Sequence, residues 1–367
     1  MILFWFLLLL TVIVFVHELG HYLVARYNGV KVEVFSIGFG KELFGFNDQS
    51  GTRWKFSLIP IGGYVKFFGD INVASSPDKD LNKNIQKKDL SKAFHNKNLL
   101  QKSAIVVAGP FANFLFAVVL FFVLFQSYGI PISSSVLPIV DKVLPNSAAS
   151  KYDIKSGDEI LKINDIEIKD FMQIRDIVVS NPNKELNFLI KRNSNNIEIV
   201  IVPDSETIID NEGNEYFEGK IGVVAKTIVL YERVGVFKSL GYAVESTYKF
   251  TFLTLKGLKE IVMGERSASE MGGPIMIANE ASKAAERGAQ DFIWIMAIIS
   301  INLGLINLFP IPLLDGGHLL FFILQSILGR PLKDGLQEYA SSIGIVLIIG
   351  ITLLVFYNDI VRYFFKS

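Results

Sequence analysis

Phe15-Val16-His17-Glu18-Leu19-Gly20-His21 is the stretch from which both the fold and the chemistry of this chain can be read. The first 16 residues carry no charge, so the motif sits inside an apolar N-terminal segment of membrane length. On an α-helix, residues i and i+4 share a face. His17 and His21 can therefore bind one tetrahedral metal ion while Glu18 reaches its water molecule, the H-E-x-x-H arrangement of zinc hydrolases.

The same pattern of residues also occurs in proteins that bind no metal. A histidine on an apolar face is often a core residue with a satisfied hydrogen bond, and soluble helices match H-E-x-x-H by chance. The chain has only four histidines, however, and two of them form this motif. Ionisable residues within a membrane segment are costly and usually functional, and a bound metal would offset that cost.

Composition identifies a membrane protein. Half of the 367 residues are hydrophobic and the mean hydropathy is +0.39. The 36 basic and 36 acidic residues balance, so no overall field favours nucleic acid as a partner. Because cysteine is absent, disulfides, thiol catalysis and thiolate metal sites are excluded, and any metal must be held by His, Asp or Glu.

Four uncharged or nearly uncharged apolar segments predict about four transmembrane helices, so we expect a polytopic α-helical membrane protein. The first lacks the basic start and cleavage site of a secretory signal, so we expect it to be retained. Basic residues outnumber acidic ones thirteen to seven in residues 26–102, whereas acidic residues outnumber basic ones twenty-three to nineteen in 127–290. The positive-inside rule then places the first segment in the cytoplasm and the second outside. The predicted spans are residues 2–25, 104–125, 292–309 and 343–356.

Between the first two spans, the pattern predicts a membrane-associated β-hairpin on the cytoplasmic side. Residues 53–58 alternate polar and apolar side chains, residues 60–63 break the run, and residues 64–68 resume it. An earlier turn or strand is expected at residues 36–40. The polar stretch 70–98 is expected to be a loop.

Short β-rich runs at residues 160–163, 186–190 and 197–202 predict a small α+β domain inserted between the second and third spans. Residues 148–164 resemble a bacterial PDZ domain, which would bind an extended peptide by strand addition; a rigid spacer is the alternative. We expect a linker at residues 204–220 and an amphipathic helix on the outer membrane surface at 234–262. The predicted divisions are 1–127 (first membrane part), 128–204 (PDZ-like domain), 205–289 (linker and amphipathic helix) and 290–367 (second membrane part).

The third metal ligand should come from residues 300–318, where two asparagines, two prolines and an aspartate occur at membrane depth. Such residues are costly there unless they line a polar cavity. Asp315 is the only carboxylate between Asp291 and Asp334, and the Pro310-x-Pro312 break can unwind the helix to aim it. His318 is the competing candidate. A catalytic zinc commonly has three protein ligands and one open position.

These motifs together resemble the site-2 protease family, and the resemblance covers nearly the whole chain. The matching segments are His17-Glu18-Leu19-Gly20-His21, Gly62-Gly63-Tyr64-Val65-Lys66, Ala108-Gly109-Pro110-x-Ala112-Asn113-Phe114 and Asn307-Leu308-x-Pro310-Ile311-Pro312-x-Leu314-Asp315-Gly316-Gly317-His318. One departure is that the chain has room for a single PDZ-like domain where some relatives have two.

The resemblance implies an intramembrane metalloprotease of the bacterial inner membrane. Zn2+ would be held by His17, His21 and Asp315, with Glu18 as the catalytic base. Substrate would contact Asn302 and Asn307 and the hairpin residues Gly62, Gly63, Tyr64, Val65 and Lys66. The resemblance also implies that the substrates are single-span membrane proteins, such as an anti-sigma factor or remnant signal peptides. Membrane lipid and a peptide ligand of the PDZ-like domain are the further partners that it implies. A membrane-anchored PDZ adaptor without proteolytic activity and a metal transporter are the alternatives, although an adaptor would not need Glu18.

Overall fold

The computed structural model describes residues 1–69, 90–209 and 215–365. They form two compact units, one built from Met1–Tyr128 with Val234–Ser367 and the other from Gly129–Arg233. The loop predicted at residues 70–98 lies outside the described residues as far as residue 89; a short helical turn, η1 (Phe94–Asn96), follows. The chain therefore leaves the first unit and returns to it, as the prediction of an inserted domain requires.

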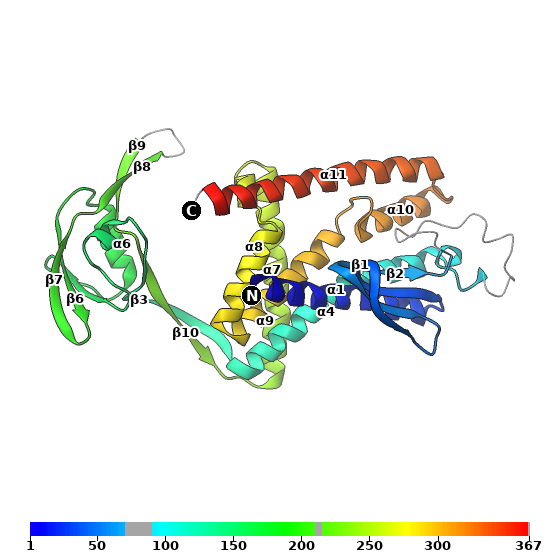
Figure 1. Cartoon of the computed structure of the whole chain (residues 1–367), viewed down its shortest axis with the longest axis horizontal. Helices are drawn as coiled ribbons and strands as arrows, with labels where there is room; N and C mark the ends of the chain where they lie inside the picture. Colours follow the sequence, from blue (N-terminus) through cyan, green and yellow to red (C-terminus); the bar gives the residue numbers. More distant parts are fainter. Residues whose placement is uncertain (70–89, 210–214, 366–367) are drawn as a thin grey trace. The chain divides into compact units, whose positions relative to one another are not determined.

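Helices dominate the first unit (Figure 1). Among the described residues, four helices are long and apolar enough to cross a membrane, and they match the four predicted spans. These are α1 (Ile2–Tyr27), α4 (Leu99–Tyr128), α9 (Ala289–Asn307) and α11 (Asp334–Ile360). The other helical elements of this unit, besides η1, are α7 (Val236–Val262), η2 (Ala268–Glu270), α8 (Pro274–Arg287), α10 (Asp315–Leu328) and η3 (Val361–Phe365). Only 6% of the most apolar part of α11 is buried, which suits a helix that faces lipid.

Glycine allows α4 to approach both α1 and α9 closely. A Cβ atom added at Gly20 of α1 would lie 2.3 Å from the carbonyl oxygen of Ala108 in α4. One added at Gly304 of α9 would lie 3.0 Å from the carbonyl oxygen of Pro110. In lipid, helices associate through close packing rather than through a hydrophobic driving force, so such small residues mark the interfaces. The crossing at Gly20 brings the histidine motif directly against α4.

Helix α8 is capped by a carboxylate from α11. Asp359 is fully buried, and its oxygens accept hydrogen bonds from three backbone N–H groups at the start of α8: Gly273 at 3.0 Å, Ile275 at 2.9 Å and Met276 at 3.1 Å. The first N–H groups of a helix have no partner within the helix, and a negative charge is favoured beside them. Asp359 therefore ties the end of α11 to α8.

The sheet of the first unit is formed by β1 (Val32–Asn47) and β2 (Arg53–Phe67). The predicted pairing of residues 53–58 with residues 64–68 is wrong, because β1 passes between them. Ser36 pairs with Lys55 on one side and with Tyr64 on the other. Both strands fold back where glycine adopts a positive φ, at Gly38 (+86°) and Gly62 (+105°). No other described strand pairs with the outer edge of residues 63–67, so this segment is an edge strand.

The turn between β1 and β2 is anchored to the end of α1. Asp48 accepts hydrogen bonds from Tyr22 Oη and Trp54 Nε1, each at 3.0 Å, and from two backbone N–H groups within the turn, those of Ser50 and Thr52. Burial by itself would raise the pKa of Asp48, but these donors, Trp54 foremost, lower it to about 2. The sheet is thus held against the helix that carries the histidine motif.

The second unit is a small α+β domain whose main sheet has the order β10-β3-β4-β6-β7, with β5 paired to β4. Its core is formed by large apolar side chains such as Ile163, Phe188 and Ile190, which are fully buried. The three predicted β-rich runs lie in β4, β6 and β7. The main elements are β3 (Ile130–Val143), α5 (Ala148–Lys151), β4 (Glu159–Ile163), β5 (Ile166–Glu167), α6 (Phe171–Val179), β6 (Leu186–Arg192), β7 (Asn195–Ile201) and β10 (Val223–Glu232).

This unit extends past the boundary predicted at residue 204. In place of the expected linker, β8 (Asp204–Ile209) pairs with β9 (Glu215–Lys220). Strand β10 then pairs with β3 from Ile130↔Glu232 to Val143↔Val223. The sequence pattern missed this because β10 pairs with a strand about ninety residues earlier, which local composition cannot reveal.

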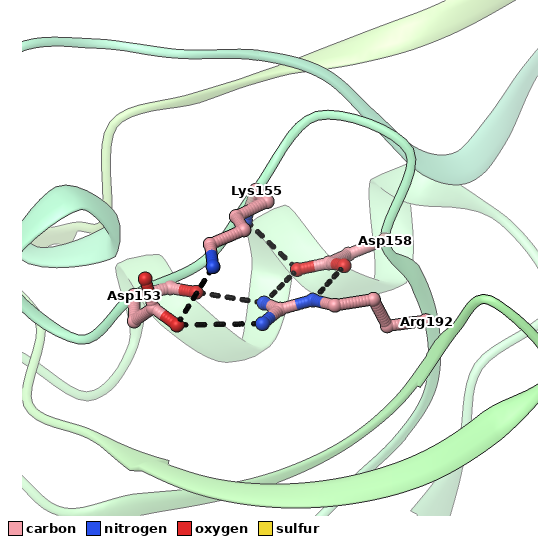
Figure 2. A network of polar contacts seen from close by, with 4 residues as sticks. All are labelled: Asp153, Lys155, Asp158 and Arg192. Carbon is pink, nitrogen blue, oxygen red and sulfur yellow. Dashed lines mark hydrogen bonds and ion pairs between the residues drawn. The ribbon is translucent and has the colours of Figure 1, made fainter.

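A buried ion pair fixes the turn before β4 to the end of β6 (Figure 2). Asp158 has a side chain only 1% exposed, and Arg192 donates to both of its carboxylate oxygens at 2.7 Å. The backbone N–H of Lys155 donates to the same carboxylate, and Asp153 contacts the outer side of the guanidinium. The hydrogen bonds to Asp158 raise the pKa of Arg192 above its ordinary value.

Candidate metal centre

Three candidate ligands converge inside the first unit. His17 and His21 lie one turn apart on α1, and Asp315 is the first residue of α10. The two Nε2 atoms are 3.2 Å apart, and Asp315 Oδ2 lies 3.3 Å from that of His17 and 3.5 Å from that of His21. Among the described residues, these three form the one cluster of His, Asp or Glu side chains with metal-binding spacing.

The three atoms fit a tetrahedral metal ion. Ligand atoms about 2.0–2.1 Å from a tetrahedral zinc lie about 3.3–3.4 Å from one another, close to the three distances here. Asp315 Oδ2 is buried, and no hydrogen bond of good geometry reaches it from the described residues. Burying a carboxylate oxygen without a partner is costly, and a cation at the meeting point of the three atoms would satisfy it.

The break between α9 and α10 aims Asp315 at the histidines. Helix α9 ends at Asn307, and α10 starts only at Asp315, after the two prolines. The chain turns back so tightly that a Cβ at Gly316 would lie 2.2 Å from the carbonyl oxygen of Phe309, and one at Gly317 2.4 Å from that of Ile311. The two glycines after the aspartate are therefore required by the turn itself.

Helix α4 supports both histidines from behind. His21 Nδ1 donates to the carbonyl oxygen of Ile105 at 2.8 Å, and Gly109 leaves room for the His21 ring. The side-chain amide of Asn113 lies 3.2 Å from His17 Nδ1. Such partners orient a ligand histidine and select the ring nitrogen that faces the metal. In the sequence, Asn113 is marked only as part of the Ala108–Phe114 motif, and nothing there indicates its place behind a candidate metal ligand.

Glu18 and the edge strand face a common cavity of about 1060 Å³. The metal cluster also lines this cavity. Gly63 brings the strand close to Glu18, since a Cβ there would lie 3.0 Å from Glu18 Cγ and 2.9 Å from Val14 Cγ1. A water molecule, a peptide and the three ligands can thus meet beside one carboxylate, which is the arrangement that metal-assisted hydrolysis needs.

The other predicted site residues divide into two groups. Gly62, Gly63, Tyr64, Val65 and Asn307 line the cavity, as does His318, which is not part of the three-ligand cluster. Lys66 forms an ion pair with Glu33 at 3.1 Å. Asn302 accepts a hydrogen bond from Thr254 of α7 at 2.9 Å. The structure therefore brings five of the seven predicted substrate-binding residues to the cavity, and it gives Lys66 and Asn302 other partners.

Comparison with known proteins identifies the family. The profile of peptidase family M50 matches residues 5–351. A protein of Rhizobium meliloti (strain 1021) that is named as a zinc metalloprotease is 39% identical over 358 residues, 97% of this chain and 95% of that one. The protease RseP of Yersinia pestis is 30% identical over 458 residues, covering 97% of this chain and 98% of that one.

Among solved structures, the PDZ domain of an SdrC-like protein of Listeria monocytogenes is 18% identical and covers 26% of this chain and 93% of that domain. Its TM-score of 0.19 is too low to establish a shared fold. The family match covers nearly the whole chain, and it favours a peptidase over a PDZ adaptor or a metal transporter. The chain belongs to peptidase family M50, the site-2 protease family, and it is an intramembrane metalloprotease.

Proposed function

We propose that this protease hydrolyses peptide bonds in or near the transmembrane segments of single-span membrane proteins, with His17, His21 and Asp315 holding Zn2+ and Glu18 as the catalytic base. The observation that carries the proposal is the convergence of the three candidate ligand atoms beside Glu18, which lies on α1, a helix of membrane length. When bound, zinc supplies Lewis-acid polarisation of the scissile carbonyl and of the attacking water.

Glu18 handles the protons of the reaction. Its carboxylate accepts a proton from the attacking water and later delivers it to the leaving amine nitrogen, so the proton count balances over the cycle. Glu18 is 9% exposed and lines the same cavity as the ligands, so it has access to a water molecule while most bulk solvent is excluded. Exclusion of bulk water strengthens the electrostatic interactions of the site.

The edge strand at residues 63–67 is the proposed binding place for the substrate backbone. A transmembrane helix hides its carbonyl groups in internal hydrogen bonds, so the scissile segment has to unwind. An unwound segment can recover backbone hydrogen bonds by pairing with an open sheet edge. Gly62, Gly63, Tyr64 and Val65 lie on the cavity wall and can offer that edge. Lys66 continues the same strand and is proposed to contribute through its backbone.

The two asparagines of α9 have different proposed roles. Asn307 lines the cavity, so its amide can hydrogen-bond to the substrate backbone. Asn302 is bonded to Thr254, so it is proposed to orient α9 and thereby the site.

The proposed location is the bacterial inner membrane, with β1 and β2 toward the cytoplasm and the PDZ-like unit outside. The excess of basic residues at 26–102 supports this orientation. An anti-sigma factor or remnant signal peptides are the proposed substrates, by analogy with RseP. An extended peptide is the proposed ligand of the PDZ-like unit.

The decisive experiment compares the wild type and Glu18→Gln after reconstitution with a single-span test substrate. The wild type is expected to bind zinc and to cleave, whereas Glu18→Gln should bind zinc and lose cleavage. If both proteins retain zinc and the wild type cleaves no substrate from a panel of single-span proteins, the proposed reaction is wrong.

A further inference from the structure

One lysine lines the cavity that contains the proposed metal site. Lys102 lies in the first turn of α4 and is partly buried. Among the described residues that line the cavity it is the one Lys or Arg, and the Asp and Glu side chains there are Glu18, Asp315 and Glu338. No described residue forms an ion pair or a hydrogen bond with its ammonium group. A partly buried ammonium is costly without an anion beside it, so an anion that enters the cavity would be stabilised by Lys102.

The packing of α4 on α1 sets the position of Lys102 relative to the metal cluster. The side-chain amide of Asn113 lies 3.2 Å from the His17 ring, and the carbonyl oxygen of Ile105 lies 2.8 Å from the His21 ring. The two helices therefore run in opposite directions. Lys102 is three residues before Ile105, so it lies about 4.5 Å further along the axis of α4, on the side of His21 that faces away from His17.

The edge strand runs toward the same end of the cavity. Gly63, at one end of the strand, packs against α1 beside the histidine motif. Phe67, at the other end, stacks on Phe94 with the ring centroids 5.0 Å apart, and both rings line the cavity together with Lys102. The two rings also belong to a buried cluster that contains residues 105–106 of α4. A strand rises about 3.3 Å per residue, so the strand covers about 13 Å between these ends. A backbone paired with it passes from the histidine motif toward Lys102.

We infer that Lys102 selects substrates that carry an acidic residue about three to five residues from the scissile bond, on the side that follows the edge strand toward Phe67. The inference rests on the proposed function, because it takes the edge strand as the binding place of the substrate backbone. An ammonium and a carboxylate form a charge-assisted hydrogen bond, which is stronger than a neutral one. A lipid phosphate offers the same charge, but Lys102 shares its cavity with the proposed metal site and the edge strand, where the substrate would lie.

The first test measures the preference of the wild type. It uses a single-span test protein that the wild type cleaves, with the cleaved bond identified by mass spectrometry. One glutamate is moved residue by residue along each side of that bond, and each substrate is compared with alanine at the same position. Glutamate about three to five residues away on one side should raise kcat/KM about tenfold, through a lower KM at similar kcat. If glutamate raises kcat/KM at no position, the inference is overturned.

The second test assigns the preference to Lys102. Lys102→Met removes the charge and keeps a long side chain, so the glutamate and alanine substrates should be cleaved at equal rates. Lys102→Glu should reverse the preference in favour of lysine at the same substrate position. Lys97→Met is the matched control: it removes a cation just before α4 that does not line the cavity, and it should keep the wild-type preference.

A lipid phosphate is distinguished by repeating the assay in phosphatidylcholine bilayers with and without phosphatidylglycerol. The preference for glutamate should be the same in both. If Lys102→Met instead lowers cleavage of the glutamate and alanine substrates by the same factor, and only where phosphatidylglycerol is present, Lys102 binds a lipid headgroup and the inference fails.

The outcomes also separate the inference from the proposed function. If the wild type cleaves and Lys102→Met keeps the full preference for glutamate, the role of Lys102 is refuted and the function stands. If the wild type binds zinc and cleaves no single-span protein, the proposed function fails together with the inference. Zinc content and thermal unfolding show whether Lys102→Met is folded; if it is not, the substrate scan with the wild type and with Lys102→Arg, which should keep the preference, decides.

Discussion

Gly109 lies against the ring of His21, and its replacement by alanine is expected to distort the proposed metal site. A Cβ atom at this position would lie 2.2 Å from Nε2, the nitrogen that faces the cluster, and 2.5 Å from Cε1. Non-bonded atoms rest about 3.5–4.0 Å apart, so the ring would have to move by more than about 1 Å. His21 cannot move freely, because Ile105 holds its Nδ1. A misplacement of about 1 Å can cost about 100-fold in rate, so we expect cleavage to fall by about 100-fold or more.

The gain in helix propensity from glycine to alanine, about 1 kcal/mol, acts against this effect but does not relieve the clash. Zinc affinity should be measured by competition with a chelator, and we expect it to weaken at least about tenfold. The control is Gly350→Ala in α11, where an added Cβ meets no atom within 4 Å. It should bind zinc and cleave like the wild type. If Gly109→Ala binds zinc as tightly as Gly350→Ala, the close packing of His21 on α4 is wrong.

Three further changes probe the edge strand, its anchor and the inserted unit. Val65→Pro removes a backbone donor from the edge strand, so it should greatly reduce cleavage while the zinc content stays unchanged. Val65→Ala is the control. Equal cleavage by the two variants would exclude pairing of the substrate with the edge strand. Hydrogen bonds hold the pKa of Asp48 at about 2, below its ordinary 3.8. The ionised carboxylate therefore stabilises the fold above pH 3.8, and this stabilisation is lost as the pH falls toward 2. In Asp48→Asn, the free energy of unfolding measured against pH should lack this contribution. Arg192→Leu leaves the buried Asp158 carboxylate without its cation and should destabilise the second unit by about 3–5 kcal/mol in chemical unfolding, whereas the double variant with Asp158→Leu should recover much of that loss.

The helices could be predicted because their signals are local. Four long runs of apolar residues gave the four membrane-length helices, and the i, i+4 spacing of His17 and His21 alone places both imidazoles on one face of α1. The third ligand could be proposed by elimination, because Asp315 is the only carboxylate in its part of the chain and follows a proline break. These inferences need composition and spacing, not long-range contacts.

Strand pairing could not be predicted in the same way. Residues 53–58 and 64–68 do form strand, but β1 lies between them, and which strands become neighbours depends on the bends at Gly38 and Gly62. The inserted unit is longer than predicted because β10 pairs with β3, far away in the sequence. In both cases the choice of partner is a long-range property that the period-two pattern does not carry.

The sequence by itself determined that two histidines and a glutamate share one turn of a membrane helix, because helical geometry converts spacing into position. Only the tertiary structure decided what surrounds them. Contacts between helices that are distant in the chain set four features of the site: the crossing at Gly20, the packing of the His21 ring on Gly109, the position of the Asn113 amide behind His17, and the turn that places Asp315. Metal-binding geometry is set at the scale of tenths of an ångström, and that precision comes from packing rather than from composition.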